Sequence, residues 1–186
     1  MKKSVMLSMG LLFAIASQSS YAGDGKPLLV ENLITPNALS CEFKFDSSGN
    51  ETIELILDYF TFANKTPLSN FDKAKKILTL SNGVKLKGVK RFSKTTEKTD
   101  ITIIDRAHID IDVKKYGVHV LRISDYRVEG LEMSEYDADG YYLILKGLPK
   151  SNIIKLEKQG VYIADKFTKI KKTKGGNTRI ICNIAG

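Results

Sequence analysis

The stretch ITIIDRAHIDIDVKKYGVHVLRIS, residues 101–124, decides the fold class of this chain. Short apolar or alternating runs cover Ile101–Asp105, His108–Val113 and Val118–Ser124, and residues 115–117 form a turn signal that ends in glycine. Because side chains two residues apart lie on the same face of a strand, this alternation is typical of antiparallel strands with one buried face. The stretch therefore predicts strands joined by a hairpin.

Runs of the same kind recur along the rest of the chain. They cover Ser40–Asp46, Thr52–Asp58, Ile77–Leu80, Val84–Phe92, Tyr141–Lys146, Ile153–Leu156, Val161–Thr168 and Thr178–Ile184. Only Asn70–Lys76 and Leu131–Tyr136 offer a helical turn. The segment Tyr141–Leu145 is apolar on both faces, which indicates a central strand covered on both sides. We therefore predict an all-β fold, either an antiparallel β-sandwich or a closed or partly open β-barrel.

The first 22 residues have the pattern of a secretory signal peptide. Lys2 and Lys3 precede the apolar run Val5–Ala16, and small residues end the segment at Ala22. We expect cleavage there, which leaves residues 23–186 as a single all-β domain in the bacterial periplasm or outside the cell. The apolar run is shorter than the about 20 residues of a membrane span, so no transmembrane anchor is expected after cleavage.

Cys41 and Cys182 are the two cysteines of the chain, and an oxidising compartment favours their pairing. Alternation places Cys41 on the same face as Phe43, and Cys182 on the same face as Ile180, so both thiols are expected to point inward. Free thiols or pairing with another chain are the alternatives. We predict a structural disulfide that links the first and last strands and contributes on the order of 5 kcal/mol to stability.

Positive charge is concentrated in two blocks. Residues 65–98 carry a net charge of +8 and residues 150–179 carry +7, whereas residues 23–64 and 99–149 carry −5 and −4. The candidates for binding an anionic surface are Lys85, Lys87, Lys90, Arg91, Lys94, Lys169, Lys171, Lys172 and Lys174. If their hairpins are neighbours, they form one surface for lipopolysaccharide phosphates, anionic lipids or acidic glycans. The alternative is that these lysines keep edge strands soluble and prevent edge-to-edge pairing.

A group of histidines and carboxylates is the sharpest candidate for metal binding. His108, Asp110 and Asp112 alternate along one run, and a symmetric hairpin about residues 114–117 would place His119 opposite Asp112. Imidazole and carboxylate groups on one face can bind zinc, iron or manganese. A solvated pair of charged strands is the alternative, and a register slip of one residue would move His119 to the other face.

Three classes of function compete. The chain has no G-x-S-x-G motif, so we predict no catalytic residue and no cofactor, and export argues against nucleic acid as a partner. We favour an exported, non-catalytic binding or structural protein of the bacterial cell envelope, whose partner is an envelope protein or an anionic envelope component. A carrier for lipid or another apolar ligand would enclose a cavity lined by residues such as Phe60, Phe62, Leu143 and Leu145. A metal-dependent hydrolase or metal binder would centre on the histidine group.

Overall fold

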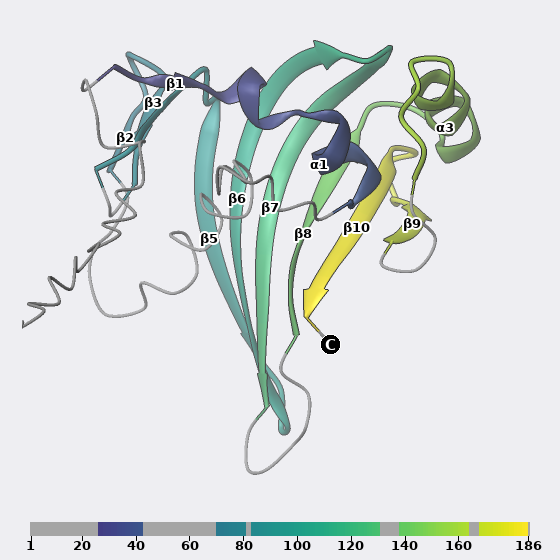
Figure 1. The fold of residues 1–186 in the computed structure, drawn as a ribbon. Helices are drawn as coiled ribbons and strands as arrows, with labels where there is room; N and C mark the ends of the chain where they lie inside the picture. The colour runs from purple at the N-terminus through teal and green to yellow at the C-terminus, as the bar shows by residue number, and fades with distance from the viewer. Residues whose placement is uncertain (1–25, 43–69, 81–82, 131–137, 164–167, 186) are drawn as a thin grey trace, which may run out of the picture.

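A computed structural model describes residues 26–42, 70–80, 83–130, 138–163 and 168–185 (Figure 1). Within these residues the chain is mostly β, as its alternating runs predict. The strands are β1 (Leu28–Leu29), β2 (Asn70–Asp72), β3 (Ile77–Thr79), β4 (Lys85–Lys87), β5 (Arg91–Lys98), β6 (Thr102–Lys115), β7 (Val118–Gly130), β8 (Ala138–Leu145), β9 (Thr168–Lys172) and β10 (Thr178–Ala185). The helices are η2 (Val30–Leu33), α1 (Pro36–Ser40) and α3 (Pro149–Glu157).

The described strands form two sheets. The larger has six antiparallel strands in the order β5-β6-β7-β8-β10-β9, and the smaller has the order β1-β4-β3-β2, with β1 parallel to β4. Because β5 and β9 are free edges of the larger sheet, a closed barrel is wrong for the described strands. Buried residues of the smaller sheet, such as Leu78 and Leu86, share one hydrophobic core with Ile109 and Leu143 of the larger sheet.

Tyr116 and Gly117 form the two-residue turn between β6 and β7. Both have positive φ, 49° and 74°, and Lys115 pairs with Val118 across the turn. Two positive φ values are those of a type I′ turn, whose twist matches the twist of the strands it joins. The turn signal of the sequence therefore forms the hairpin that it predicts.

A bulge interrupts the ladder between β6 and β7. Ile111 and Asp112 of β6 face only Leu121 of β7, and Leu121 itself has no partner in β8. Bulges bend a sheet and increase its twist, and the curvature of the long strands is clear in Figure 1. The register expected for a turn over residues 114–117 is wrong, because the two-residue turn of Tyr116 and Gly117 pairs His119 with Lys114 and not with Asp112.

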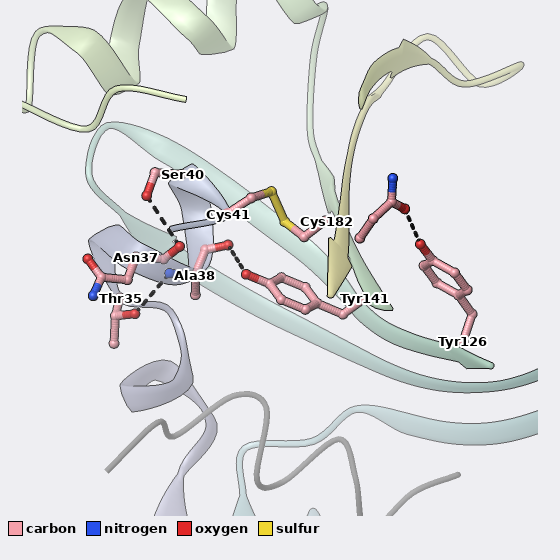
Figure 2. The surroundings of a disulfide bond; sticks show 9 residues. Thr35, Asn37, Ala38, Ser40, Cys41, Tyr126, Tyr141 and Cys182 are labelled. Carbon is pink, nitrogen blue, oxygen red and sulfur yellow. Dashed lines mark hydrogen bonds between the residues drawn. A yellow bond between two sulfur atoms is a disulfide. The ribbon is translucent and has the colours of Figure 1, made fainter. Parts of the chain in front are cut away.

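The N-terminal segment covers one face of the larger sheet, which we call the inner face. Helix α1 begins after Thr35, whose Oγ1 accepts a hydrogen bond from the backbone N of Ala38 at 3.1 Å, and Pro36 occupies its first turn. The helix buries Ala38 and Leu39. Tyr141 of β8 donates a hydrogen bond from Oη to the carbonyl oxygen of Ala38 at 2.9 Å (Figure 2). This buried bond ties α1 to the middle of the sheet.

Cys41 and Cys182 form the predicted disulfide, with Cα atoms 5.2 Å apart and a sequence separation of 141 residues. Cys182 lies on β10 and is buried with Ile180, as the alternation predicts. Cys41, however, is the C-cap of α1 and has a left-handed backbone with φ of 58°. The prediction that the disulfide links two strands is thus wrong for Cys41. The disulfide instead holds the end of a helix against the sheet (Figure 2).

The run Ile153–Leu156 predicts a strand but lies in helix α3, so that prediction is wrong. Pro149 occupies the first turn of the helix, where its fixed φ is favourable and its missing N–H costs nothing. Asn152 is buried, and its Nδ2 lies 2.8 Å from Thr178 Oγ1 and within 3.2 Å of two carbonyl oxygens at residues 146–147. These contacts fasten α3 to the ends of β8 and β10.

Several expected segments lie outside the described residues. They are the signal peptide over residues 1–22, the run Thr52–Asp58, the possible helical turn Leu131–Tyr136 and most of the run Ser40–Asp46. In the part of the chain that the structure describes, no helix has the length and apolar character needed to cross a membrane.

Candidate functional site

The outer face of the larger sheet, opposite the face that α1 covers, carries polar side chains. Strand β6 shows the division: Ala107 and Ile109 are buried on the inner face, whereas His108 and Asp110 lie on the outer face. The strand register aligns outer-face residues into rows that cross the sheet. Two adjacent rows place charged and hydrogen-bonding groups in contact with one another.

The first of these, which we call the arginine row, takes one residue from each strand. From β5 to β9 its members are Arg91, Asp110, Arg122, Ile144, Arg179 and Lys171. Four cationic side chains and one carboxylate give the row a net charge of +3. With neighbouring strands about 4.8 Å apart, the two ends of the row are roughly 24 Å apart. The row is thus a line of positive charge across the whole width of the sheet.

Asp110 fixes two arginines of the row. Arg91 Nε donates to Asp110 Oδ2 at 2.7 Å, and Arg122 Nε donates to Asp110 Oδ1 at 2.6 Å. Burial alone would raise the pKa of Asp110, but the hydrogen bonds and positive charges of Arg122 and Arg91 outweigh it and lower this pKa. The carboxylate is therefore ionised at neutral pH. Both bonds use Nε, and among the described residues the terminal nitrogens of the two guanidinium groups have no acceptor, so they can donate to a ligand.

Arg179 and Lys171 are the two cations of the row without a carboxylate partner among the described residues, and Arg179 is the better ordered of them because it stacks on a ring. Its guanidinium carbon lies 4.8 Å from the centroid of the Tyr142 ring, and its buried Nε makes no hydrogen bond in the described part of the chain. Stacking on an aromatic ring orients a guanidinium without neutralising it. The charge of Arg179 is therefore available to an anion on the outer face.

The second row, which we call the histidine row, lies beside the arginine row. Its members are Ser93, His108, Ser124, Tyr142, Ile181 and Lys169. His108 Nδ1 lies 2.8 Å from Ser124 Oγ and 3.4 Å from Tyr142 Oη, while its Nε2 lies 3.4 Å from Thr95 Oγ1. This network supports the Tyr142 ring on which Arg179 stacks.

Ser124 and His108 do not form a nucleophile and base that a substrate can reach, because Ser124 is fully buried. Burial, followed by the positive charges of Arg122 and Arg106, lowers the pKa of His108. The imidazole is therefore neutral at neutral pH. Its contacts with hydroxyl groups are those of a packed polar network.

The structure does not gather the four residues predicted to bind metal. Asp110 is held by two arginines, and Asp112 accepts hydrogen bonds from Lys90 and from His119, which lower the pKa of Asp112 to about 2. His108 belongs to the separate hydroxyl network. Within the described ranges, no group of three or more histidine, cysteine, aspartate or glutamate side chains is placed to hold a metal ion. The contact between Asp112 and His119 forms across the bulge.

The predicted basic residues lie in separate places. Lys85 and Lys87 are on β4 of the smaller sheet, and Lys90, Arg91 and Lys94 are at or on β5. Residues 169–172 lie on β9, and Lys174 lies in the turn before β10. The β5 cations and the β9 lysines therefore lie at opposite edges of the larger sheet, with four strands between them, while Lys85 and Lys87 lie on the other sheet. The arginine row, which begins at Arg91 and ends at Lys171, connects these two edges.

Arg122, Arg179 and Tyr142 are the residues of this site that sequence reasoning misses. Arg122 lies in a block with a net negative charge, which hides it from a search for basic segments. The alternation of the strand runs would place these side chains on the outer face, but their alignment into a row depends on the bulge at Leu121. That bulge has no distinct sequence signal.

The described residues expected to line an apolar cavity lie instead in the packed core. Leu143 and Leu145 are fully buried and belong to the packed core. Phe60 and Phe62 lie outside the described residues.

Comparison with known proteins finds no matching family model, no similar curated protein and no similar solved structure.

Proposed function

We propose that this chain is an exported, non-catalytic binding protein of the bacterial cell envelope, and that its outer face holds a phosphate-bearing glycan such as lipopolysaccharide. The arginine row is the observation that carries this proposal. It joins the two basic edges of the sheet and includes Arg179, whose charge no described carboxylate neutralises. The signal-peptide pattern of residues 1–22 and the disulfide agree with an oxidising compartment outside the cytoplasm.

The geometry of the row suits an extended ligand. A guanidinium presents parallel N–H donors that match two oxygens of a phosphate, which a lysine ammonium cannot do. Asp110 holds Arg91 and Arg122 in position before a ligand arrives, so less side-chain freedom is lost on binding. The roughly 24 Å length of the row suits several phosphates spaced along a chain.

The test is the binding of residues 23–186, with the disulfide formed, to purified lipopolysaccharide and to the same material after phosphatase treatment. Wild-type protein should bind the phosphorylated form, and affinity should fall steeply between about 50 and about 300 mM salt because exposed charges are screened. The double variant Arg122→Gln, Arg179→Gln should bind at least about tenfold more weakly, since each charge-assisted contact contributes about 1.5 to 3 kcal/mol.

Lys85→Gln is the matched control, because it removes a positive charge at an exposed position on β4 of the smaller sheet, outside the arginine row. Its affinity should stay within about twofold of wild type. Equal affinity of the double variant and wild type would contradict the proposal, and so would binding that survives high salt or phosphatase treatment. Thermal unfolding of each variant checks that weaker binding does not reflect loss of the fold.

A further inference from the structure

A second cationic site lies away from the arginine row, in a hollow between the β6–β7 turn, the end of β8 and helix α3. The hollow has a volume of about 640 Å³. Four lysines line it: Lys114 and Lys115 from the end of β6, Lys146 after β8, and Lys155 from α3. His119 lines it as well, and none of the described residues that form its wall is acidic. None of its lining residues belongs to the arginine row.

The lysines of the hollow differ in their partners. Lys115 donates a hydrogen bond from Nζ to the carbonyl oxygen of Glu31 at 3.2 Å and lies 5.4 Å from the centroid of the Tyr116 ring. Lys114, Lys146 and Lys155 form no ion pair with any described carboxylate. Positive charges gathered in one hollow repel one another, and an anion placed among them removes that repulsion.

The wall of the hollow is fixed by backbone contacts. Gly117 lies against α3, and a Cβ built on it would be 3.5 Å from both the Cβ and the carbonyl oxygen of Lys155. The backbone N of Lys146 donates to the carbonyl oxygen of His119 at 2.9 Å. The buried side chain of Asn152 anchors α3 to the adjoining strand ends. The lysine stems are therefore carried by elements that hold one another in place.

We infer that this hollow binds a compact phosphoryl group, either a free phosphate monoester or the phosphate of a lipid headgroup. A phosphate monoester carries a charge of about −1.5 to −2 at neutral pH and three acceptor oxygens, which suits three ammonium groups without carboxylate partners. A volume of about 640 Å³ is within the range of small-molecule sites. This inference is independent of the proposed glycan site, because the two share no residue.

The test uses residues 23–186 with the disulfide formed, titrated in a calorimeter with glycerol 3-phosphate. In a second arm the same protein is sedimented with phosphatidylcholine vesicles that contain or lack phosphatidic acid. Binding to glycerol 3-phosphate identifies a free phosphate monoester as the ligand, and binding only to vesicles with phosphatidic acid identifies a lipid phosphate. The double variant Lys146→Gln, Lys155→Gln should weaken that binding by at least about tenfold.

Lys158→Gln is the matched control, since Lys158 is an exposed lysine at the end of α3 that does not line the hollow. It should leave the affinity within about twofold of wild type. The Arg122→Gln, Arg179→Gln variant should also keep its phosphate binding, which separates this site from the outer face. Absence of binding in both arms, or an equal loss in the control and the double variant, would overturn the inference.

Discussion

Tyr141 and Tyr142 are neighbours on β8, yet they lie on opposite faces of the same sheet. Tyr141 is 1% exposed and donates its hydroxyl to the backbone of α1, whereas Tyr142 is 8% exposed and lies between His108 and the guanidinium of Arg179. The inner face is covered by apolar side chains and a helix that the disulfide holds in place. The outer face is packed by its own polar and charged groups. The inner face therefore stabilises the fold, and the outer face is the one that we propose to bind a ligand.

The largest expected effect is that of removing the disulfide, which holds α1 against the inner face. The double variant Cys41→Ser, Cys182→Ser should lose about 4 to 5 kcal/mol of stability, because the disulfide closes a loop with a sequence separation of 141 residues. Urea unfolding of the variant and of oxidised wild type measures the difference. Reduced wild-type protein should unfold at the same urea concentration as the variant. A loss below about 1 kcal/mol would mean that the disulfide does not restrict the unfolded chain.

The next prediction compares two neighbouring aliphatic residues of β8. Leu143→Ala removes a fully buried core side chain and should cost about 2 to 5 kcal/mol, because a cavity forms. Ile144→Ala on the partly exposed outer face should cost clearly less, about 1 to 2 kcal/mol. Both are measured by urea unfolding at neutral pH. Equal costs would show that the outer face is packed as tightly as the inner face.

The two tyrosines sharpen the comparison at the level of a single hydroxyl group. Tyr141→Phe leaves the buried carbonyl of Ala38 without its partner and should cost about 1 to 3 kcal/mol. Tyr142→Phe removes only a long contact of 3.4 Å to His108 and should cost less than about 0.5 kcal/mol. A larger cost for Tyr142→Phe would contradict the assignment of the stabilising hydrogen bond to the inner face.

The smallest effect concerns pH. Burial and the nearby arginines lower the pKa of His108 in the folded protein below its ordinary value of 6.5. The unfolded chain then binds a proton more readily than the folded one, so the free energy of unfolding falls as pH decreases through 6.5 toward the lowered pKa. His108→Gln should make this fall shallower between about pH 7 and about pH 5.5. Unfolding curves of both proteins across that range check it, and equal slopes would contradict the prediction.

Sequence reasoning succeeds where the signal is local or where few pairings are possible. The alternation around His108–Val113 and the turn ending at Gly117 follow from residue types and spacing. The pairing of Cys41 with Cys182 follows from there being two cysteines in the chain. The helix at Ile153–Leu156 is missed because a short apolar run fits a strand or a helix equally well, and Pro149 is the stronger signal.

The candidate site is harder to predict because it depends on contacts between distant strands. Arg91, Arg122 and Arg179 come from three strands, and their alignment requires the register of four pairings. The predicted metal group is not brought together, since the two-residue turn pairs His119 with Lys114 while the arginines hold Asp110. Charge blocks along a sequence do not report which cations face one another across a sheet.

The position of the disulfide fixes when, during synthesis of the chain, α1 can be linked covalently to the sheet. Synthesis produces Cys41 long before Cys182, and β10, which carries Cys182, lies between β8 and β9 in the sheet. During that interval α1 has no covalent tie to the sheet, and the thiol of Cys41 is open to pairing with other molecules. Oxidation of a chain that has not yet reached β10 can join Cys41 only to a thiol other than Cys182. The covalent tie between α1 and the sheet therefore forms only after β10 has been synthesised.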